Sequence, residues 1–262
     1  MRERLLVATA DLGKIAAFAS YDVERHDDAR RLWPIALRVA RQAQTPRATD
    51  LTVALLLSMT HQAPHLRRPQ EALGFVQLGY GITASGSPSL SASTASCLAG
   101  FEAMCHGALG DAGACDRALG QAVEHFAGTD PAMAEPWIAY FSVAELLAQQ
   151  GFAQYTLALA TGDAKPAARA VPLLQQAVNS HGPARAGART VNLANLAGAQ
   201  ALTGDLNAAV HTGHQAVEEI TALASPRACD RLRILDTILQ PHGTDPAVGE
   251  VREEIRQALT AA

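Results

Sequence analysis

The chain has 262 residues, of which 48% are hydrophobic, 18% charged and 5% aromatic, and its formal net charge is -4. An intrinsically disordered chain would contain fewer apolar residues and carry more net charge, and a disulfide scaffold would be shorter and richer in cysteine. The mildly acidic balance argues against direct contact with nucleic acid. The densest apolar run, residues 51–59, is shorter than the roughly 18 residues of a membrane span. Abundant Ala and Leu with few aromatic residues favour helices over sheets.

The first residues combine basic and apolar side chains, as a secretory signal peptide does. Asp11 and Lys14 interrupt the apolar stretch, however, and the pattern continues as an amphipathic helix. We therefore expect no export signal and a cytoplasmic protein. The cysteines form no CxxC pair, so we expect buried thiols rather than a metal site or disulfides at Cys97, Cys105, Cys115 and Cys229.

A turn followed by a helix start recurs along the chain. A Gly-Asp pair lies at residues 110–111, 162–163 and 204–205, and a small residue follows five positions after each Gly. Gly ends a helix because it adopts the left-handed conformation, and Asp caps the next helix through its side-chain oxygen. The small residue lets two helices cross closely. Two further copies lack the Gly, so that the small positions are Ala29, Ala72, Cys115, Ala167 and Ala209.

Each small position lies in the second helix of a predicted hairpin. Hairpins stack into a solenoid because one hairpin cannot bury its apolar face alone. We predict an all-α fold, in which residues 1–262 form a single TPR-like α-solenoid of about five helical hairpins plus a C-terminal capping helix pair. The predicted helix pairs are about 3–20 with 27–43, 47–63 with 69–82, 90–108 with 112–127, 142–161 with 164–179, 185–202 with 206–223 and, as the cap, 227–239 with 246–260.

Three stretches depart from a regular array. Residues 131–140 lengthen the interval between the third and fourth hairpins, and we expect them to make an extra helical turn. Pro34 falls inside a predicted helix and Pro64 near the end of another. An interior proline removes a backbone hydrogen bond and kinks a helix, so these positions predict bends in the array.

Residues 195–217 resemble a tetratricopeptide (TPR) unit. They contain Asn-Leu-small, then Leu-x-Gly-Asp, then a small residue five positions after the Gly. Most of the chain also resembles a narrower group, the TPR regions of actinobacterial XRE-type helix-turn-helix transcriptional regulators. Residues 61–73, 108–119 and above all 130–151 carry this likeness, because the last range contains the family's Pro-Trp-aliphatic-x-Tyr-Phe-x-x-Ala-Glu-Leu segment.

The family resemblance implies an N-terminal helix-turn-helix domain that binds DNA. This chain shows none, since residues 1–20 already resemble a TPR helix. Three expectations stay open: a relative that lost the domain, a part of a longer regulator, or a stand-alone relative. DNA binding is therefore not carried over to this chain.

TPR arrays present the first helix of each hairpin on a concave face, and helical spacing places the residues of that face. The expected positions are Asp11, Lys14, Ser58, His61, Cys97, Gly100, Phe101, Met104, Gln149, Phe152, Thr156, Val191, Ala194 and Asn195. This face is mostly small, apolar and neutral. A clamp for a peptide carboxylate needs Lys or Arg together with Asn, and only Asn195 matches, so we predict against such a clamp. A hydrophobic peptide, a partner helix or an apolar small molecule fits better.

The candidate ligand-groove residues are His61, Phe101, Met104, Phe152, Thr156, Asn192 and Asn195. The amides of Asn192 and Asn195, one turn apart, are suited to an extended peptide backbone, but the interpretation we favour is that they form hydrogen bonds with neighbouring helices or with the turn. Phe101, Met104 and Phe152 are expected more in the core than facing a ligand, because apolar stripes usually pack. Trp137 is expected to be a structural plug between repeats.

No catalytic or metal site is predicted. His61 with His65, and His211 with His214, have the spacing of two metal ligands on one helix, but we interpret both as surface pairs without supporting acidic or Cys ligands. The Ser-rich and Gly-rich stretches at 79–97 contain neither a nucleophile elbow nor a phosphate loop.

These observations predict a regulatory TPR domain that binds a peptide, a partner protein or an apolar small molecule, linked to transcriptional regulation. It would need no cofactor, and homodimerisation is open. A protein scaffold without a sensing role is the first alternative. An enzyme built on a TPR scaffold is the second, because a fold never excludes chemistry.

Overall fold

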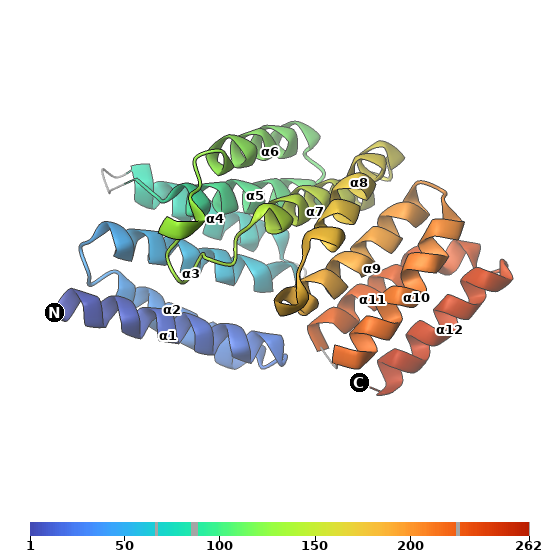
Figure 1. The fold of residues 1–262 in the computed structure, drawn as a ribbon, viewed down its shortest axis with the longest axis horizontal. Coiled ribbons are helices and arrows are strands. Elements are labelled where there is room, and N and C mark those ends of the chain that lie inside the picture. The colour runs from blue at the N-terminus through green and yellow to red at the C-terminus, as the bar shows by residue number, and fades with distance from the viewer. Residues whose placement is uncertain (66–67, 85–88, 224–225, 262) are drawn as a thin grey trace. The chain divides into compact units, whose positions relative to one another are not determined.

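The computed structural model covers residues 1–262 and describes all of them except 66–67, 85–88, 224–225 and 262 (Figure 1). In the described part of the chain the architecture is all-helical, with twelve α-helices, three short 3-10 turns and no strand. The helices are α1 (Arg2–Asp22), α2 (His26–Ala40), α3 (Pro46–His65), α4 (Pro69–Ala84), α5 (Ala92–Ala108), α6 (Ala112–Phe126), α7 (Val143–Thr161), α8 (Ala164–Ser180), α9 (Ala186–Leu202), α10 (Leu206–Leu223), α11 (Pro226–Leu239) and α12 (Pro246–Ala261).

The all-α prediction is confirmed, and each helix begins and ends within three residues of its predicted bounds. Consecutive helices pack as hairpins: α1 on α2, α3 on α4, α7 on α8 and α9 on α10. The α5–α6 pair is joined by the Ser96 hydroxyl, which donates to the backbone oxygen of Ala122 over 2.7 Å. The predicted extra helical turn is the 3-10 turn Pro131–Met133, whose start is capped by the side chain of Asp130. Pro34 lies inside α2, which continues through it.

The Gly-Asp turns have the geometry that their sequence predicts. Gly110, Gly162 and Gly204 have φ angles of 79°, 71° and 84°, in the left-handed region where a side chain is unfavourable. The carboxylates of Asp163 and Asp205 accept hydrogen bonds from the first-turn backbone N–H groups of α8 and α10. The five small positions have exposed fractions of 0% at Ala29, Ala72, Cys115, Ala167 and Ala209.

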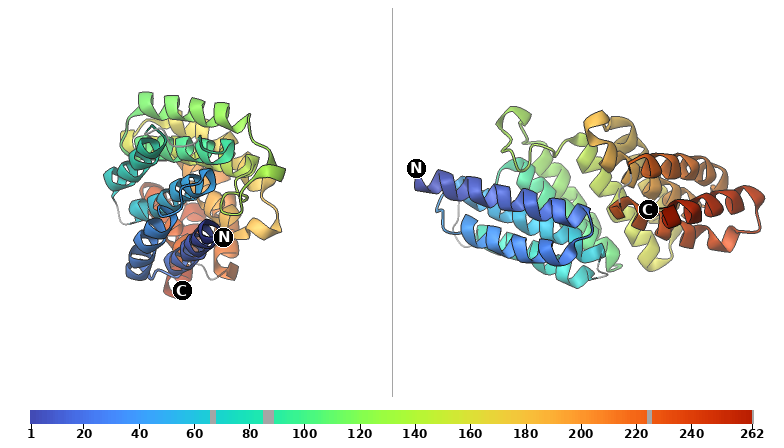
Figure 2. Two further views of the ribbon diagram at one scale, coloured as in Figure 1. Left: turned by 90° about the vertical axis from the view of Figure 1, so that its left-hand side faces the viewer. Right: turned by 90° about the horizontal axis from the view of Figure 1, so that it is seen from below.

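The helices form two compact units. Unit 1 comprises Met1–Leu109 and Gly113–Ser142, and unit 2 comprises Gly110–Ala112 and Val143–Ala262. In unit 1 the first helices of the hairpins are neighbours, α1 beside α3 and α3 beside α5. Helix α1 lies at the edge of this unit, which the two views of Figure 2 also show. In unit 2, α11 packs on α9 and α12 on α10, and Leu232, Leu235 and Val251 are completely buried between them.

All four cysteines are buried and none forms a disulfide. Within the residues that the structure describes, no helix has the length and apolar character needed to cross a membrane.

Candidate functional site

The segment 134–142 folds back onto the first helices of unit 1. It follows the 3-10 turn at 131–133 and reaches α1, α3 and α5 with side-chain and backbone contacts. We call the surface formed by α1, α3 and α5 the inner face of unit 1. Sequence reasoning expected Trp137 to plug a space between repeats, and the structure places its indole on this face, with 4% of the residue exposed.

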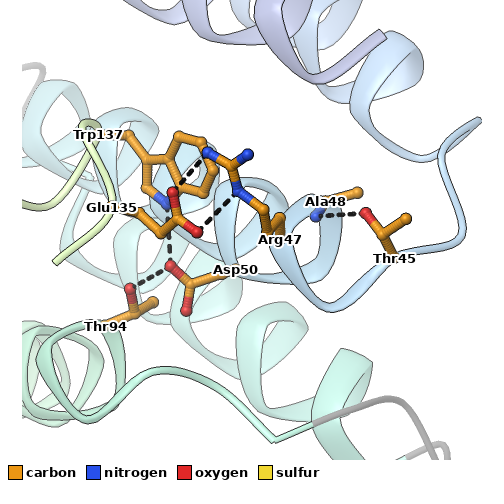
Figure 3. Close-up of polar contacts among 7 residues, drawn as sticks. All are labelled: Thr45, Arg47, Ala48, Asp50, Thr94, Glu135 and Trp137. Carbon is orange, nitrogen blue, oxygen red and sulfur yellow. Dashed lines mark hydrogen bonds and ion pairs between the residues drawn. The ribbon is translucent and has the colours of Figure 1, made fainter. Parts of the chain in front are cut away.

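A buried carboxylate anchors Trp137. Asp50, on α3, is 4% exposed. One of its oxygens, Oδ2, accepts from the Trp137 indole N–H at 2.9 Å and from the Thr94 hydroxyl at 2.8 Å (Figure 3). The other, Oδ1, accepts from the backbone N–H of Ser91 at 2.9 Å. A buried carboxylate is stable only when it is well hydrogen-bonded. Asp50 has three such donors, one from α5, one from the N-cap of α5 and one from the 134–142 segment.

An ion pair holds the segment on the other side of the indole. The Arg47 guanidinium, at the start of α3, donates to both carboxylate oxygens of Glu135 over 2.7 and 2.6 Å (Figure 3). Its central carbon lies 5.5 Å from the centre of the Trp137 ring, within the range of a cation–π interaction. The hydrogen bond to Glu135 raises the pKa of Arg47. This pair is solvent-exposed, so it orients the segment more than it stabilises the fold.

Two positions expected on the groove face also contact the segment. The Lys14 ammonium, on α1, donates to the backbone oxygen of Trp137 over 3.3 Å. Burial lowers the pKa of Lys14, and the nearby Asp11 carboxylate partly opposes that shift. The Cys97 sulfur, on α5, lies 3.9 Å from the Tyr140 hydroxyl oxygen. The inner face therefore contacts both the backbone and the side chains of this segment, whose residues 136–140 form turns closed by the backbone hydrogen bonds of Ile138 and Ala139 to Glu135.

His61 and Phe101 pack against each other in unit 1. Their ring centres are 4.6 Å apart at 83°, and the Phe18 ring lies edge-on to His61 at 5.8 Å. Phe101 is only 1% exposed, as expected of a core side chain, whereas Met104 on the same helix is half-buried. The side chain of His65, the other half of the predicted histidine pair, lies outside the part of the chain that is described.

The remaining predicted groove residues lie in unit 2, on the neighbouring helices α7 and α9. Asn192 is 5% exposed and its amide nitrogen lies 3.2 Å from Nε2 of His181; Asn195 is 2% exposed. Burial lowers the pKa of His181, so its ring favours the neutral form that accepts from this amide. The bond between Asn192 and His181 is the packing alternative considered from the sequence. A ligand role for either amide stays a prediction.

Phe152 and Thr156 are half-buried on α7. The Arg231 guanidinium carbon, from α11, lies 4.9 Å from the centre of the Phe152 ring. The Thr156 hydroxyl donates to backbone oxygens of its own helix, at Phe152 and Ala153, both over 3.0 Å. The predicted groove residues are thus divided between the two units.

The second predicted histidine pair has other partners. His214 lies 2.7 Å from the Glu254 carboxylate on α12, and His211 lies 3.3 Å from the Gln215 amide. Among the described residues no group of three or more His, Cys, Asp or Glu side chains is arranged to hold a metal ion. Two cavities, of about 390 Å³ beside the start of α8 and about 190 Å³ between α2, α3 and α4, are lined mostly by other residues.

Sequence reasoning missed Asp50, Arg47 and Glu135. Asp50 is the fifth residue of α3, just past its first turn, where a single acidic side chain is not unusual in a helix. The signal that distinguishes it is its position directly before the apolar run at 51–57, all of which is buried. No family model, no curated protein and no solved structure matches the chain.

Proposed function

We propose that this chain is a regulatory TPR-like solenoid domain that binds an aromatic-containing, turn-forming peptide segment of a partner protein on the inner face of unit 1. The observation that carries the proposal is the 134–142 segment, which occupies this face through the Trp137–Asp50 hydrogen bond. A surface that holds a turn-forming segment of its own chain has the chemistry to hold a similar segment of another. The resemblance to TPR-containing transcriptional regulators supports a regulatory role.

Three features of the inner face suit peptide recognition. A buried carboxylate accepts from an indole N–H, an arginine fork holds a carboxylate two residues earlier, and a lysine holds a backbone carbonyl. Such paired polar contacts give specificity because a wrong side chain leaves a buried group without a partner. The class of ligand proposed is therefore a peptide with the order acidic, any residue, Trp, which forms a turn after the acidic residue as residues 135–139 do.

The segment 134–142 acts as an intramolecular competitor for this surface. Attachment in the same chain gives it an effective concentration in the millimolar range when the linker is short. A peptide in solution therefore has to displace it. In the regulatory proposal, exchange between the chain's own segment and a partner's segment is the event that is sensed.

A labelled peptide of residues 131–142 tests the proposal. We expect it to bind the Trp137→Ala variant with micromolar affinity and the wild-type chain about 100-fold more weakly, because only the variant has lost its internal anchor. A peptide with Ala in place of Trp is the control and should bind neither. Adding Asp50→Asn to the variant should weaken binding at least tenfold, because the amide replaces one of the two acceptor oxygens by a donor and removes the charge that the indole N–H bonds. A variant that retains its helical circular dichroism and does not bind the peptide would refute the proposal. A second variant, with a Gly-Ser linker in place of residues 134–141, repeats the test if Trp137→Ala does not fold.

A protein scaffold without a sensing role is the second candidate. It predicts stable complexes with partner proteins, whereas sensing predicts a ligand-dependent rise in melting temperature, because a ligand that binds only the native state stabilises it. Thermal unfolding of the Trp137→Ala variant with and without the peptide separates the two.

A further inference from the structure

Helix α1 presents an unusual outer surface. Every exposed residue from Leu5 to Val23 is apolar except Thr9, and the large apolar side chains among them are 57–67% exposed. We call this set the α1 outer stripe: Leu5, Ala8, Thr9, Leu12, Ile15, Ala16, Ala19 and Val23. The exposed side of the next helix, α2, in contrast includes Arg30, Arg31 and Arg38. A contiguous exposed apolar surface of this kind marks an interaction site.

The opposite side of α1 is already used by the fold. Val7, Ala10, Ala17 and Tyr21 are buried, and α1 packs on α2 and α3. A helix that is apolar on nearly all sides is normally covered on all sides. At its edge position in unit 1, α1 therefore lacks one neighbouring helix among the described residues of that unit.

The spacing of the stripe is that of a two-helix seam. The series Leu5, Ala8, Leu12, Ile15, Ala19 and Val23 advances in steps of three and four residues over about five turns, which is the heptad pattern by which paired helices interlock. The small residues between the large ones allow two helix backbones to approach closely.

The order of sizes along the stripe is nearly the same from either end. One large residue is followed by two small ones, then by Leu12 and Ile15 at the centre, then by two alanines and one large residue. Thr9 is the polar member of the first small pair, and its methyl group keeps it close to alanine in packing character. A surface with this symmetry is suited to contact a second copy of itself about a two-fold axis.

Charge selects the direction of pairing. Arg2 and Arg4 flank the start of the stripe, while Glu3 lies on the opposite side of the helix, and Glu24 follows the end. In a parallel pair these ends would place like charges together. In an antiparallel pair Arg4 of one copy lies near Glu24 of the other, twice by symmetry, and charge pairs of this kind fix partner and orientation.

We propose that the α1 outer stripe is the interface of a homodimer in which the α1 helices of two copies pair antiparallel, with Leu12 of one copy against Ile15 of the other. One helix pair is a small interface for a specific complex, so we expect association in the micromolar range. Dimerisation of this kind is independent of the inner face and of its ligand.

Sedimentation of the purified chain at about 5–100 µM tests the dimer. The wild-type chain should be dimeric at the upper end, and Leu12→Glu should raise the dissociation constant about 100-fold, because it places a charge at the centre of an apolar seam. The matched control is Leu78→Glu on α4, where the leucine is 58% exposed but lies outside the stripe; it should leave the constant unchanged. A wild-type chain that stays monomeric at 100 µM, or equal effects of the two variants, would overturn the proposal.

The orientation has its own test. Arg4→Glu should weaken the dimer about tenfold, and the double variant Arg4→Glu with Glu24→Arg should restore it, because each new pair again joins opposite charges. In a parallel dimer the double variant would not recover. A mixture of Ala8→Cys and Ala19→Cys chains should likewise form a mixed disulfide-linked dimer on oxidation, whereas cross-links between identical chains would exclude the antiparallel pairing.

Discussion

Asp50 shows how one buried charge organises a surface whose parts lie far apart in the sequence. Its carboxylate accepts an indole N–H from a residue 87 positions later and a hydroxyl from one 44 positions later. Removing a buried acceptor leaves each donor without a partner, and that desolvation penalty exceeds the net value of the hydrogen bonds themselves. The fold and the position of Trp137 therefore depend on the same carboxylate.

Substitutions around Asp50 should show that buried polar contacts contribute more to the free energy of unfolding than exposed ones. We expect Asp50→Ala to lower the free energy of unfolding by about 3–5 kcal/mol, because it strands buried donors, and Trp137→Phe by about 1.5–3 kcal/mol for the lost bond to a charged acceptor. Arg47→Met, which breaks an exposed ion pair, should change it by less than about 1 kcal/mol. Urea unfolding measures all three. An Arg47 effect as large as that of Asp50 would contradict this ranking.

His181 should make the stability of the chain depend on pH. Burial lowers the pKa of its ring in the folded state, where Arg185 and Arg189 add to the shift and Glu145 opposes it. In the unfolded chain the pKa is the ordinary value of about 6.5. Below that pH the unfolded state binds a proton that the native state does not, so stability is lost as pH falls, by up to about 1.4 kcal/mol per pH unit for one proton.

The His181→Gln variant isolates this effect from the carboxylates. Subtracting its unfolding free energy from that of the wild-type chain should give a difference that is largest above pH 7 and shrinks as the pH falls below about 6.5, where the unfolded imidazole takes up a proton before the folded one does. A difference that is constant over this range would show that His181 titrates alike in both states.

At the scale of the helix, the Gly-Asp turns explain why so much of the fold follows from local sequence. A left-handed Gly stops one helix, a capping Asp starts the next, and a small residue sets the crossing. All three signals lie within six residues, so the helix ends are predictable without knowledge of the tertiary structure. The 134–142 segment has no such local signal. Its place on the inner face depends on Asp50 and Lys14, which are distant in sequence.

The outer stripe of α1 was also invisible in the sequence for a physical reason. Alternation of apolar and polar residues identifies the buried side of a helix, but α1 is largely apolar on both sides, so its pattern does not say which residues pack within the chain. Only the burial of Val7, Ala10 and Tyr21 assigns the inward side, and the same assignment leaves Leu12 and Ile15 outside. The predicted ligand residues met a similar limit, since helical spacing gave Phe101 and Met104 the same expectation of a core position, although Phe101 is 1% exposed and Met104 is only half-buried.

Substitution by alanine should have opposite effects at a glycine in a turn and at a glycine inside a helix. Gly162 has a φ angle of 71° and open space where a β-carbon would lie, so Gly162→Ala should destabilise the chain by about 1 kcal/mol through backbone strain alone. Gly120 lies exposed inside α6 with equally open space, so Gly120→Ala should stabilise it by about 0.5–1 kcal/mol through helix propensity. Thermal and urea unfolding of the pair check the opposite signs, and a stabilising Gly162→Ala would contradict the assigned role of the turn.

At the scale of the molecule, each of the two units has a core of its own. Unit 1 buries Trp33, Tyr21 and Leu55, and unit 2 buries Tyr155, Leu174 and Leu235. The chain has two tryptophans, Trp33 and Trp137, and both belong to unit 1. Tryptophan fluorescence therefore reports the unfolding of unit 1, whereas far-ultraviolet circular dichroism reports the helices of both units.

We expect tryptophan fluorescence and circular dichroism to give different unfolding midpoints when only one unit is destabilised. A β-carbon at Gly198, in unit 2, would lie 2.6 Å from the Tyr155 hydroxyl oxygen and 3.0 Å from its ring. Gly198→Ala should therefore destabilise unit 2 by about 1–3 kcal/mol through overpacking. Its circular dichroism curve in urea should shift to lower concentration while the fluorescence midpoint stays in place. Asp50→Ala, in unit 1, should shift the fluorescence midpoint instead. Equal shifts of both probes in both variants would mean that the chain unfolds as one cooperative body, because overpacking beside Tyr155 would then also lower the midpoint that the tryptophans of unit 1 report.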